Sequence, residues 1–269
     1  MHNLQEEQII LGITQGISEL LPISSSMHLT IIPKLAKYIR NSCCDFSGYD
    51  NISAKIMAHL GSLLVFVIFF RKILFRDTCL LLTRNHKFFN TFAFYSAIAT
   101  LCTSIMTIIF KNKISTYLDK YDQTNVMITA NIISGILLYL ADKKCLQKSK
   151  LTASKSFIIG VIQFLASISG VSRLGITITA CRLMNINRNQ SVSFAMFCAI
   201  PAIFGAIVYD LAGQKMNFHL WKDMSILLCT TIIFGLSFIK LCNYSLVRFG
   251  FLWIMIYRIF ASIVLLMCR

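Results

Sequence analysis

Apolar residues fill six long segments of the chain, which short polar or basic stretches separate. A membrane-spanning helix needs about 20 mostly apolar residues. Backbone polar groups find no water inside a bilayer, so such segments are expected to be helical. The segments lie at 54–71, 88–110, 124–141, 191–212, 223–242 and 248–268. The pattern therefore predicts an all-α polytopic membrane protein.

Composition supports this class and excludes others. The chain is 56% hydrophobic and only 14% charged, whereas a soluble domain carries about a quarter charged residues. The formal net charge of +15 is interpreted as topology signal and contact with anionic membrane lipids. No interleaving of basic and aromatic residues is found, so no nucleic-acid partner is expected.

Four further apolar pieces are too short or too interrupted to span a bilayer. They form two pairs, each broken at a Pro-, Gly- or Ser-rich point. Paired short segments of this kind are typical of re-entrant hairpins, and in corresponding halves they indicate the binding site. The four pieces lie at about 6–21, 26–38, 156–168 and 174–184.

The two pairs also resemble each other in sequence. Four positions of the first pair recur 148 residues later in the second, as from Gly12 to Gly160. The other three correspondences are Gln15 with Gln163, Ile23 with Val171, and Ser24 with Ser172. Each hairpin returns to its own side and three spans then cross the membrane, so the second repeat must be inverted. We predict one membrane domain over 1–269, with repeats at about 1–142 and 155–269.

Loop charges predict the orientation. The loops 71–87 and 143–155 are rich in Lys and Arg and fall on the same side, whereas the loops around Lys113 and Lys215 carry fewer. Basic loops stay in the cytoplasm. Both termini and the mouth of the first hairpin are therefore expected outside the cytoplasm.

Gln15 and Glu19 are the first candidates for chemistry. They are four residues apart, so they share one helix face. An amide and a carboxylate there could ligate a hard divalent cation or hold a neighbouring side chain. The alternative is that Glu19 pairs with a basic residue.

Three serines and a histidine follow the break at Pro22. Ser24, Ser25 and Ser26 lie where backbone N–H groups are free to face an anion. His28 comes three residues after Ser25 and could share a proton with it or with substrate. The alternative is that the serines only bond helix carbonyls.

The second hairpin offers a candidate phosphate site. Ser172, Arg173, Gly175 and Thr177 combine small hydroxyls, a close backbone approach and a planar guanidinium fork suited to phosphate oxygens. The alternative is that Arg173 caps a helix C-terminus.

Two more polar residues lie inside predicted spans. Arg258 is near the middle of the last span, too deep to reach water easily, so it should face the protein interior. His59, in the first full span, is interpreted as a polar residue with a structural partner.

These motifs resemble the undecaprenyl-diphosphatase family of bacterial membrane proteins, which is also linked by name to bacitracin resistance. The first hairpin is similar to that family's pair of acidic-type positions followed by L-P-x-S-S-[ST]-G-H, and the second to its P-G-x-S-R-S-G-x-T. The likeness extends to 60–63, 194–205 and Tyr257-Arg258. This sequence departs from the pattern at Met27, Ser169 and Leu174.

The resemblance implies hydrolysis of undecaprenyl diphosphate to undecaprenyl phosphate and inorganic phosphate, which recycles the lipid carrier of cell-wall synthesis. It implies an inner-membrane protein whose site faces the periplasmic side, and a Mg²⁺ or Ca²⁺ ion with Gln15 and Glu19 as candidate ligands. Membrane lipids are the expected surroundings, and a homodimer is a possible state. By position, the catalytic candidates are Glu19, Ser25, His28 and Arg173. The substrate-binding candidates are Ser24, Ser26, Ser172, Gly175, Thr177 and Arg258.

Two questions stay open at this stage. The nucleophile is Ser25, His28 or water. The alternative function is that of a polyprenyl-phosphate carrier or flippase without hydrolysis, because inverted repeats with broken helices are also a transporter architecture.

Overall fold

The computed structural model describes residues 2–40, 52–212 and 224–268. Within these ranges the chain is helical, and the only β-type pairing is an isolated bridge between Ser149 and Ile186. The elements are α1 (His2–Ser18), α2 (Ser25–Arg40), α3 (Ile52–Leu82), η1 (His86–Asn90), α4 (Phe92–Leu118), α5 (Gln123–Lys144), α6 (Ala153–Gln163), η2 (Phe164–Ser167), α7 (Arg173–Leu183), α8 (Arg188–Ala212), α10 (Ser225–Phe249) and α11 (Leu252–Met267).

Five helices, α3, α4, α5, α8 and α10, are long and apolar enough to cross a membrane. They confirm a multi-pass membrane protein. The sixth span, predicted at 248–268, is wrong as a full span. α10 runs on to Phe249 and ends at Gly250, whose φ of 72° is readily adopted only by glycine. The remaining helix, α11, has 16 residues, about 24 Å, against a hydrocarbon core of about 30 Å.

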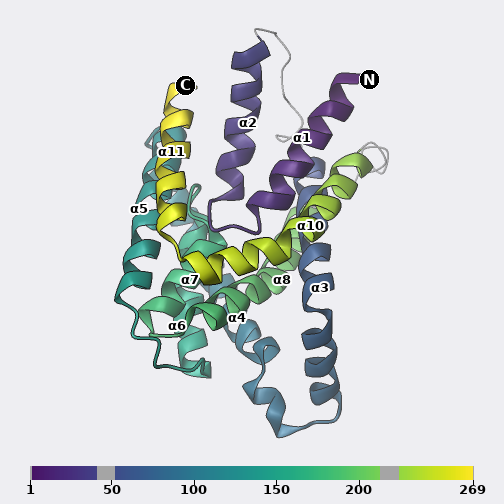
Figure 1. Ribbon diagram of the computed structural model, residues 1–269, viewed down its shortest axis with the longest axis vertical. Coiled ribbons are helices and arrows are strands. Elements are labelled where there is room, and N and C mark those ends of the chain that lie inside the picture. The colour runs from purple at the N-terminus through teal and green to yellow at the C-terminus, as the bar shows by residue number, and fades with distance from the viewer. Residues whose placement is uncertain (1, 41–51, 213–223, 269) are drawn as a thin grey trace.

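The four short helices form two hairpins, as predicted. In Figure 1, α1 and α2 lie at the end of the molecule that carries both termini, whereas α6 and α7 lie below them. The first hairpin turns through Ser24, which has a φ of 69°. The second turns through Gly170, with a φ of 94°, where an added Cβ would lie 2.2 Å from the Met127 carbonyl oxygen. Only glycine fits this second tip.

Each hairpin packs its first helix against a long span. α1 lies along α10, and α6 lies along α4. Glycines allow both crossings to be close. A Cβ on Gly12 would lie 1.8 Å from the Thr230 Oγ1, and one on Gly160 would lie 2.4 Å from the Ala99 carbonyl oxygen. The two hairpins are thus held by the same kind of tight helix crossing.

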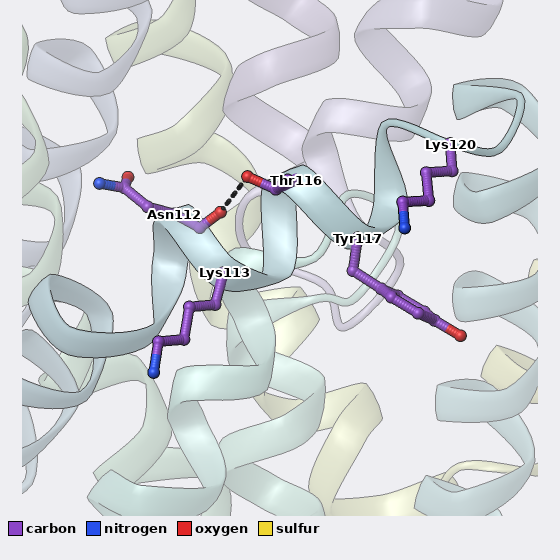
Figure 2. A pocket seen from close by; sticks show the side chains of 5 residues that line it. All are labelled: Asn112, Lys113, Thr116, Tyr117 and Lys120. Atoms are coloured by element: carbon purple, nitrogen blue, oxygen red, sulfur yellow. Dashed lines mark hydrogen bonds between the residues drawn. The ribbon is translucent and has the colours of Figure 1, made fainter.

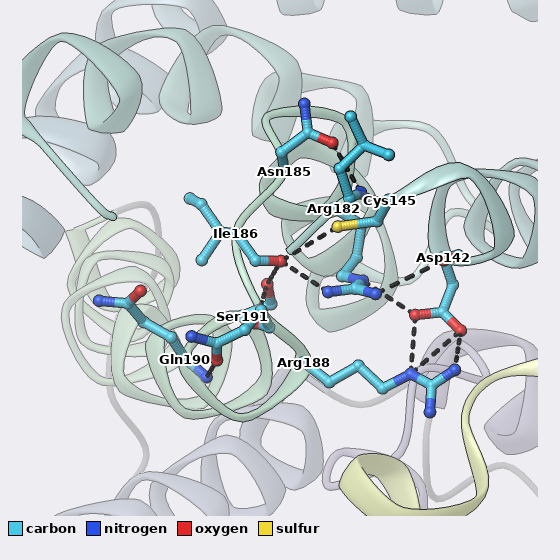
Figure 3. Close-up of polar contacts among 10 residues, drawn as sticks. Asp142, Cys145, Arg182, Asn185, Ile186, Arg188, Gln190 and Ser191 are labelled. Carbon is cyan, nitrogen blue, oxygen red and sulfur yellow. Dashed lines mark hydrogen bonds and ion pairs between the residues drawn. The ribbon is translucent and has the colours of Figure 1, made fainter. Parts of the chain in front are cut away.

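A buried charge cluster closes the mouth of the second hairpin (Figure 3). Asp142, at the end of α5, accepts hydrogen bonds from Arg182 Nε at 2.8 Å and from Arg188 Nη2 at 2.7 Å. Arg182 also donates to the Ile186 carbonyl oxygen at 2.6 Å. Breaking such a buried pair costs about 3–5 kcal/mol. The cluster therefore fixes α7 and the start of α8 to α5.

Candidate active site

The tips of the two hairpins meet at the guanidinium of Arg258. Arg258 Nη1 donates to the Pro22 carbonyl oxygen at 3.4 Å, and Nη2 donates to the Gly170 carbonyl oxygen at 3.1 Å. Pro22 also packs on the second hairpin, because a Cβ on Gly175 would lie 3.4 Å from its side chain. Two breaks that lie far apart in the sequence thus form one site.

Arg258 makes two further hydrogen bonds at this junction. Its Nε donates to Asn131 Oδ1 at 2.8 Å and its Nη2 to Ser134 Oγ at 2.6 Å. The side chain is 0% exposed, and no carboxylate pairs with it among the described residues. That Arg258 also contacts substrate stays a prediction. Arg258 faces the interior as predicted, and there it clamps the tips together.

Gln15 and Glu19 lie together on the first hairpin. Gln15 is fully buried, and its Nε2 donates to Ser62 Oγ at 3.1 Å and more weakly to Glu19 Oε2 at 3.4 Å. The Gln15 Oε1 has no partner in the described structure. Glu19 is half-buried and forms no ion pair with a basic residue among those described. The two side chains present hard oxygen atoms, the type that Mg²⁺ and Ca²⁺ prefer.

The serines and His28 surround the first tip. Ser24 is buried, and its Oγ is 3.1 Å from that of Ser26, which is exposed. Ser25 begins α2 and is half-buried. His28 Nδ1 donates to the Ser24 carbonyl oxygen at 2.8 Å, and its Nε2 is 2.7 Å from Tyr257 Oη. Both ring nitrogens are engaged, and no hydrogen bond joins Ser25 to His28 in the described residues.

Two of the departures from the family pattern, Met27 and Leu174, are buried apolar side chains. Met27 lies inside α2, is 0% exposed and packs with Ala261 and Leu265. The left-handed conformation at this turn falls on Ser24 instead. Leu174 is buried in the main apolar core.

Arg173 begins α7 at the second tip. Ser172 caps this helix by accepting a hydrogen bond from the Gly175 N–H at 3.1 Å. Thr177 is buried and donates to the Arg173 carbonyl oxygen at 2.8 Å, so its hydroxyl proton is already used within the helix. Arg173 is half-buried, and its Nη1 is buried with no partner in the described residues. It stands at a helix N-terminus, so the alternative of a C-terminal cap is wrong.

Two polar residues near this junction were not predicted as site residues. His59 Nδ1 on α3 and Ser18 Oγ on α1 are buried without a partner in the described structure. The charges of Glu19 and Arg173 both act on His59. The interpretation of His59 as a satisfied polar residue is therefore wrong for its Nδ1. No sequence signal marked it, because the contact between Ser62, one turn later on α3, and Gln15 is seen only in the structure.

Unpaired buried polar atoms thus occur on α1 and α3, which pack together, and on the first residue of α7. An unsatisfied buried polar group costs about 1–3 kcal/mol. Native proteins keep few of them, and each requires an explanation such as a ligand, ion or water. The four atoms here are Gln15 Oε1, Ser18 Oγ, His59 Nδ1 and Arg173 Nη1. They include acceptors for a cation or proton and a donor for an anion, which is the set that a metal–phosphate ligand would satisfy.

A separate hollow of about 460 Å³ lies at the end of α4 (Figure 2). It is lined by Asn112, Lys113, Thr116, Tyr117 and Lys120. These side chains come from one helix end and the residue after its cap, and the Thr116 hydroxyl is bonded to the Asn112 carbonyl oxygen at 2.8 Å. None of the candidate site residues lines it, so it does not compete with the junction of the tips.

Comparison with known proteins gives a match over almost the whole chain. Residues 8–264 match the family described as Bacitracin resistance protein BacA. The undecaprenyl-diphosphatase of Pelagibacter ubique is 37% identical over 267 residues, covering 96% of this chain and 95% of the relative. The undecaprenyl-diphosphatase of Aquifex aeolicus is 32% identical over 271 residues, covering 95% and 97%. These matches include both hairpins and all five long spans.

Proposed function

Because the chain belongs to the BacA family, we propose that it hydrolyses undecaprenyl diphosphate to undecaprenyl phosphate and inorganic phosphate. It is a membrane phosphatase that acts on a phosphoric anhydride and returns the lipid carrier to cell-wall synthesis. The observation that carries the proposal is the junction of the two tips through Arg258. It joins the hairpin that carries the serines and His28 to the hairpin that carries Arg173, whose Nη1 has no partner in the described residues. Carriage without hydrolysis has no support in the names of the relatives.

Arg173 is the phosphate-binding residue in this proposal. Its guanidinium is half-buried at the N-terminus of α7, where the first N–H groups of a helix have no partner within the helix. A charged fork and free N–H groups together favour a diphosphate. They stabilise charge that develops on the transferred phosphoryl group. Ser172 supports them by fixing the start of α7 through Gly175.

The first tip supplies the groups for proton transfer and attack. Ser25 is accessible enough to attack phosphorus or to orient water, and Ser24 and Ser26 flank it. His28 is the general base, held by the Ser24 carbonyl oxygen. Ser25 has no hydrogen bond to this base in the described structure, which favours Ser25 as a positioning group and water as the nucleophile.

A divalent cation fits the donor set only in part. The described residues contain no cluster of three or more His, Cys, Asp or Glu side chains that could hold a metal. Mg²⁺ is often held by one or two protein oxygens plus substrate phosphates, and Gln15 Oε1 with the Glu19 carboxylate supplies such a pair. When bound, the ion would neutralise charge on the diphosphate.

The inverted repeat is also part of the proposal. Its support is the equivalent packing of α1 on α10 and of α6 on α4, with Gly12 and Gly160 at the two crossings. The tips then approach from opposite sides and meet at Arg258. Cysteine accessibility on the two hairpin mouths would test this, with opposite sides labelled if the repeat is inverted.

We propose the inner membrane as the location, with the mouth of the first hairpin outward. Lys215, one of the charges used for this orientation, lies outside the described residues, so the support is the basic loop between α5 and α6. A homodimer would bury exposed apolar side chains such as Leu101 and Ile108 of α4. Cross-linking of cysteines at these two positions tests it.

The test of function is phosphate release from undecaprenyl diphosphate by the protein purified in detergent. Arg173→Ala should lower kcat/KM by about 100-fold or more, as expected for loss of a charge-stabilising group. Arg248→Ala, at an exposed arginine of α10, is the control and should leave turnover unchanged. Near-normal turnover by the folded Arg173 variant would refute the assigned site.

A further inference from the structure

Tyr257 forms a close pair with His28. The Tyr257 Oη lies 2.7 Å from His28 Nε2, and the two rings stack with centroids 5.5 Å apart and planes 6° apart. Tyr257 precedes Arg258, the residue that clamps the hairpin tips. Its backbone position is therefore fixed by the same junction that forms the site.

The partners of His28 determine where its protons lie. The Ser24 carbonyl oxygen can only accept a hydrogen bond, so Nδ1 must carry a hydrogen in both charge states of the ring. In the neutral imidazole, Nε2 is then the basic atom, and it accepts the hydrogen of the Tyr257 hydroxyl. In the imidazolium, Nε2 donates to Tyr257 Oη. A phenol can take either role, so the pair stays bonded through a change of charge.

Exposure decides how a proton reaches this base. His28 is 7% exposed, whereas Tyr257 is 38% exposed. With Nδ1 bonded to backbone and Nε2 covered by the phenol, an attacking group cannot contact the imidazole directly. Tyr257 is thus the more exposed partner of the pair.

We propose that Tyr257 is a catalytic residue that relays protons between His28 and the reacting centre. The inference rests on the proposed function, in which His28 is the general base. One O–H bond of the attacking water breaks and its proton forms a new O–H bond on Tyr257 Oη. The original Tyr257 proton passes at the same time to His28 Nε2. The positive charge gained by the imidazole balances the negative charge left on the attacking oxygen, which forms the bond to phosphorus as the polyprenyl phosphate departs.

The surroundings of the pair contain one fixed charge. Arg258, on the same helix as Tyr257, is the charged group that acts on His28, and the first hairpin contributes the neutral Ser24 carbonyl. Arg258 makes four hydrogen bonds, all to neutral acceptors. The pH dependence of the relay is assigned to His28 and Tyr257, the two groups that exchange the proton.

The test uses four forms of the full-length protein, wild type, Tyr257→Phe, His28→Ala and the double variant, with Tyr244→Phe as a matched control. Phenylalanine keeps the stacked ring and removes only the hydroxyl. Tyr244 is an exposed tyrosine of α10 that has no hydrogen bond in the described structure. We expect Tyr257→Phe to lower kcat by about 100-fold, the lower end for general acid–base catalysis, with KM changed less than about twofold.

Two further readouts separate a relay from a structural role. The double variant should be no slower than His28→Ala alone, because the two residues act as one unit. The wild-type kcat/KM should rise between about pH 5 and 8 as the histidine loses its proton. This rise with pH should be absent from both Tyr257→Phe and His28→Ala. The Tyr244 control should retain it.

The outcomes distinguish this inference from the function on which it rests. A wild type that releases no phosphate refutes the proposed function. The relay alone is refuted if the wild type is active and His28→Ala is inactive, but Tyr257→Phe keeps the wild-type kcat and pH dependence. It is also refuted if Tyr257→Phe is faster than the wild type, because the phenol then merely covers the base. If the Phe variant fails to fold, single-turnover rates of the wild type in H₂O–D₂O mixtures decide: a curved dependence indicates two moving protons, and a linear one overturns the relay.

Discussion

Replacing Arg258 by lysine should loosen the junction between the two hairpin tips. The side chain makes four hydrogen bonds to neutral acceptors, on Asn131, Ser134, Gly170 and Pro22. Lysine keeps the positive charge but replaces the planar fork with donors that leave a single point. It cannot reach both tip carbonyls and Asn131 at once.

The expected cost follows from the lost bonds. Hydrogen bonds to charged groups contribute about 1.5–3 kcal/mol each in soluble proteins, whereas interhelical bonds within membranes average about 0.6 and reach about 1.7 kcal/mol. Two lost bonds at about 1 kcal/mol each give a destabilisation of about 2 kcal/mol. At roughly 2–4 °C per kcal/mol for a chain of this size, the Tm should fall by about 4–8 °C. Misplacement of the tips by about 1 Å should lower kcat by about 100-fold.

The assay pairs thermal unfolding in detergent with steady-state phosphate release. Arg248→Lys, at an exposed arginine, is the control and should change neither quantity. If Arg258→Lys keeps the wild-type Tm and kcat but raises KM several-fold, then Arg258 contacts substrate directly and the clamp is refuted.

Two other predictions test the packing around the site. Gly160→Ala should lower the free energy of unfolding by about 1–3 kcal/mol through overpacking, because the added Cβ would lie 2.4 Å from a backbone oxygen. Gly205→Ala is the control: nothing lies within 4 Å of the added Cβ, so this variant should be neutral or slightly stabilising. Equal Tm values for the two variants would contradict the close crossing. Asp142→Asn should lower the free energy of unfolding by about 3–5 kcal/mol, because two arginines lose their carboxylate partner. Asp119→Asn, at an exposed site, is the control and should leave stability unchanged. An unchanged Tm for Asp142→Asn would show that the cluster does not hold the second hairpin.

Much of the fold could be predicted from the hydrophobic pattern. Five of the six spans and both hairpins follow from segment length and from the breaks at Pro22 and Gly170, because a bilayer imposes a length and glycine marks a turn. The sixth span could not, since apolar residues lie directly on both sides of Gly250, Phe249 and Phe251, and hide the helix boundary. Only its positive φ, a tertiary outcome, divides α10 from α11.

The candidate site was predictable as residue types but not as pairings. Ser25 and His28 are close in sequence, yet the histidine bonds to Tyr257, 229 residues away. The depth of Arg258 in its span predicted an interior position, but periodicity could not show that its partners are the two tips. The unpaired His59 Nδ1 became a site candidate only when α3 was seen to carry the Gln15 partner Ser62.

The measurement that tests the central claim most directly is inorganic phosphate release from undecaprenyl diphosphate by the purified protein in detergent, with Mg²⁺, Ca²⁺ or a chelator and no membrane gradient. The account predicts catalytic turnover that yields one phosphate and one undecaprenyl phosphate per substrate molecule and that falls when the chelator is present. A folded protein that binds the lipid diphosphate but releases no phosphate under any of these conditions would contradict it.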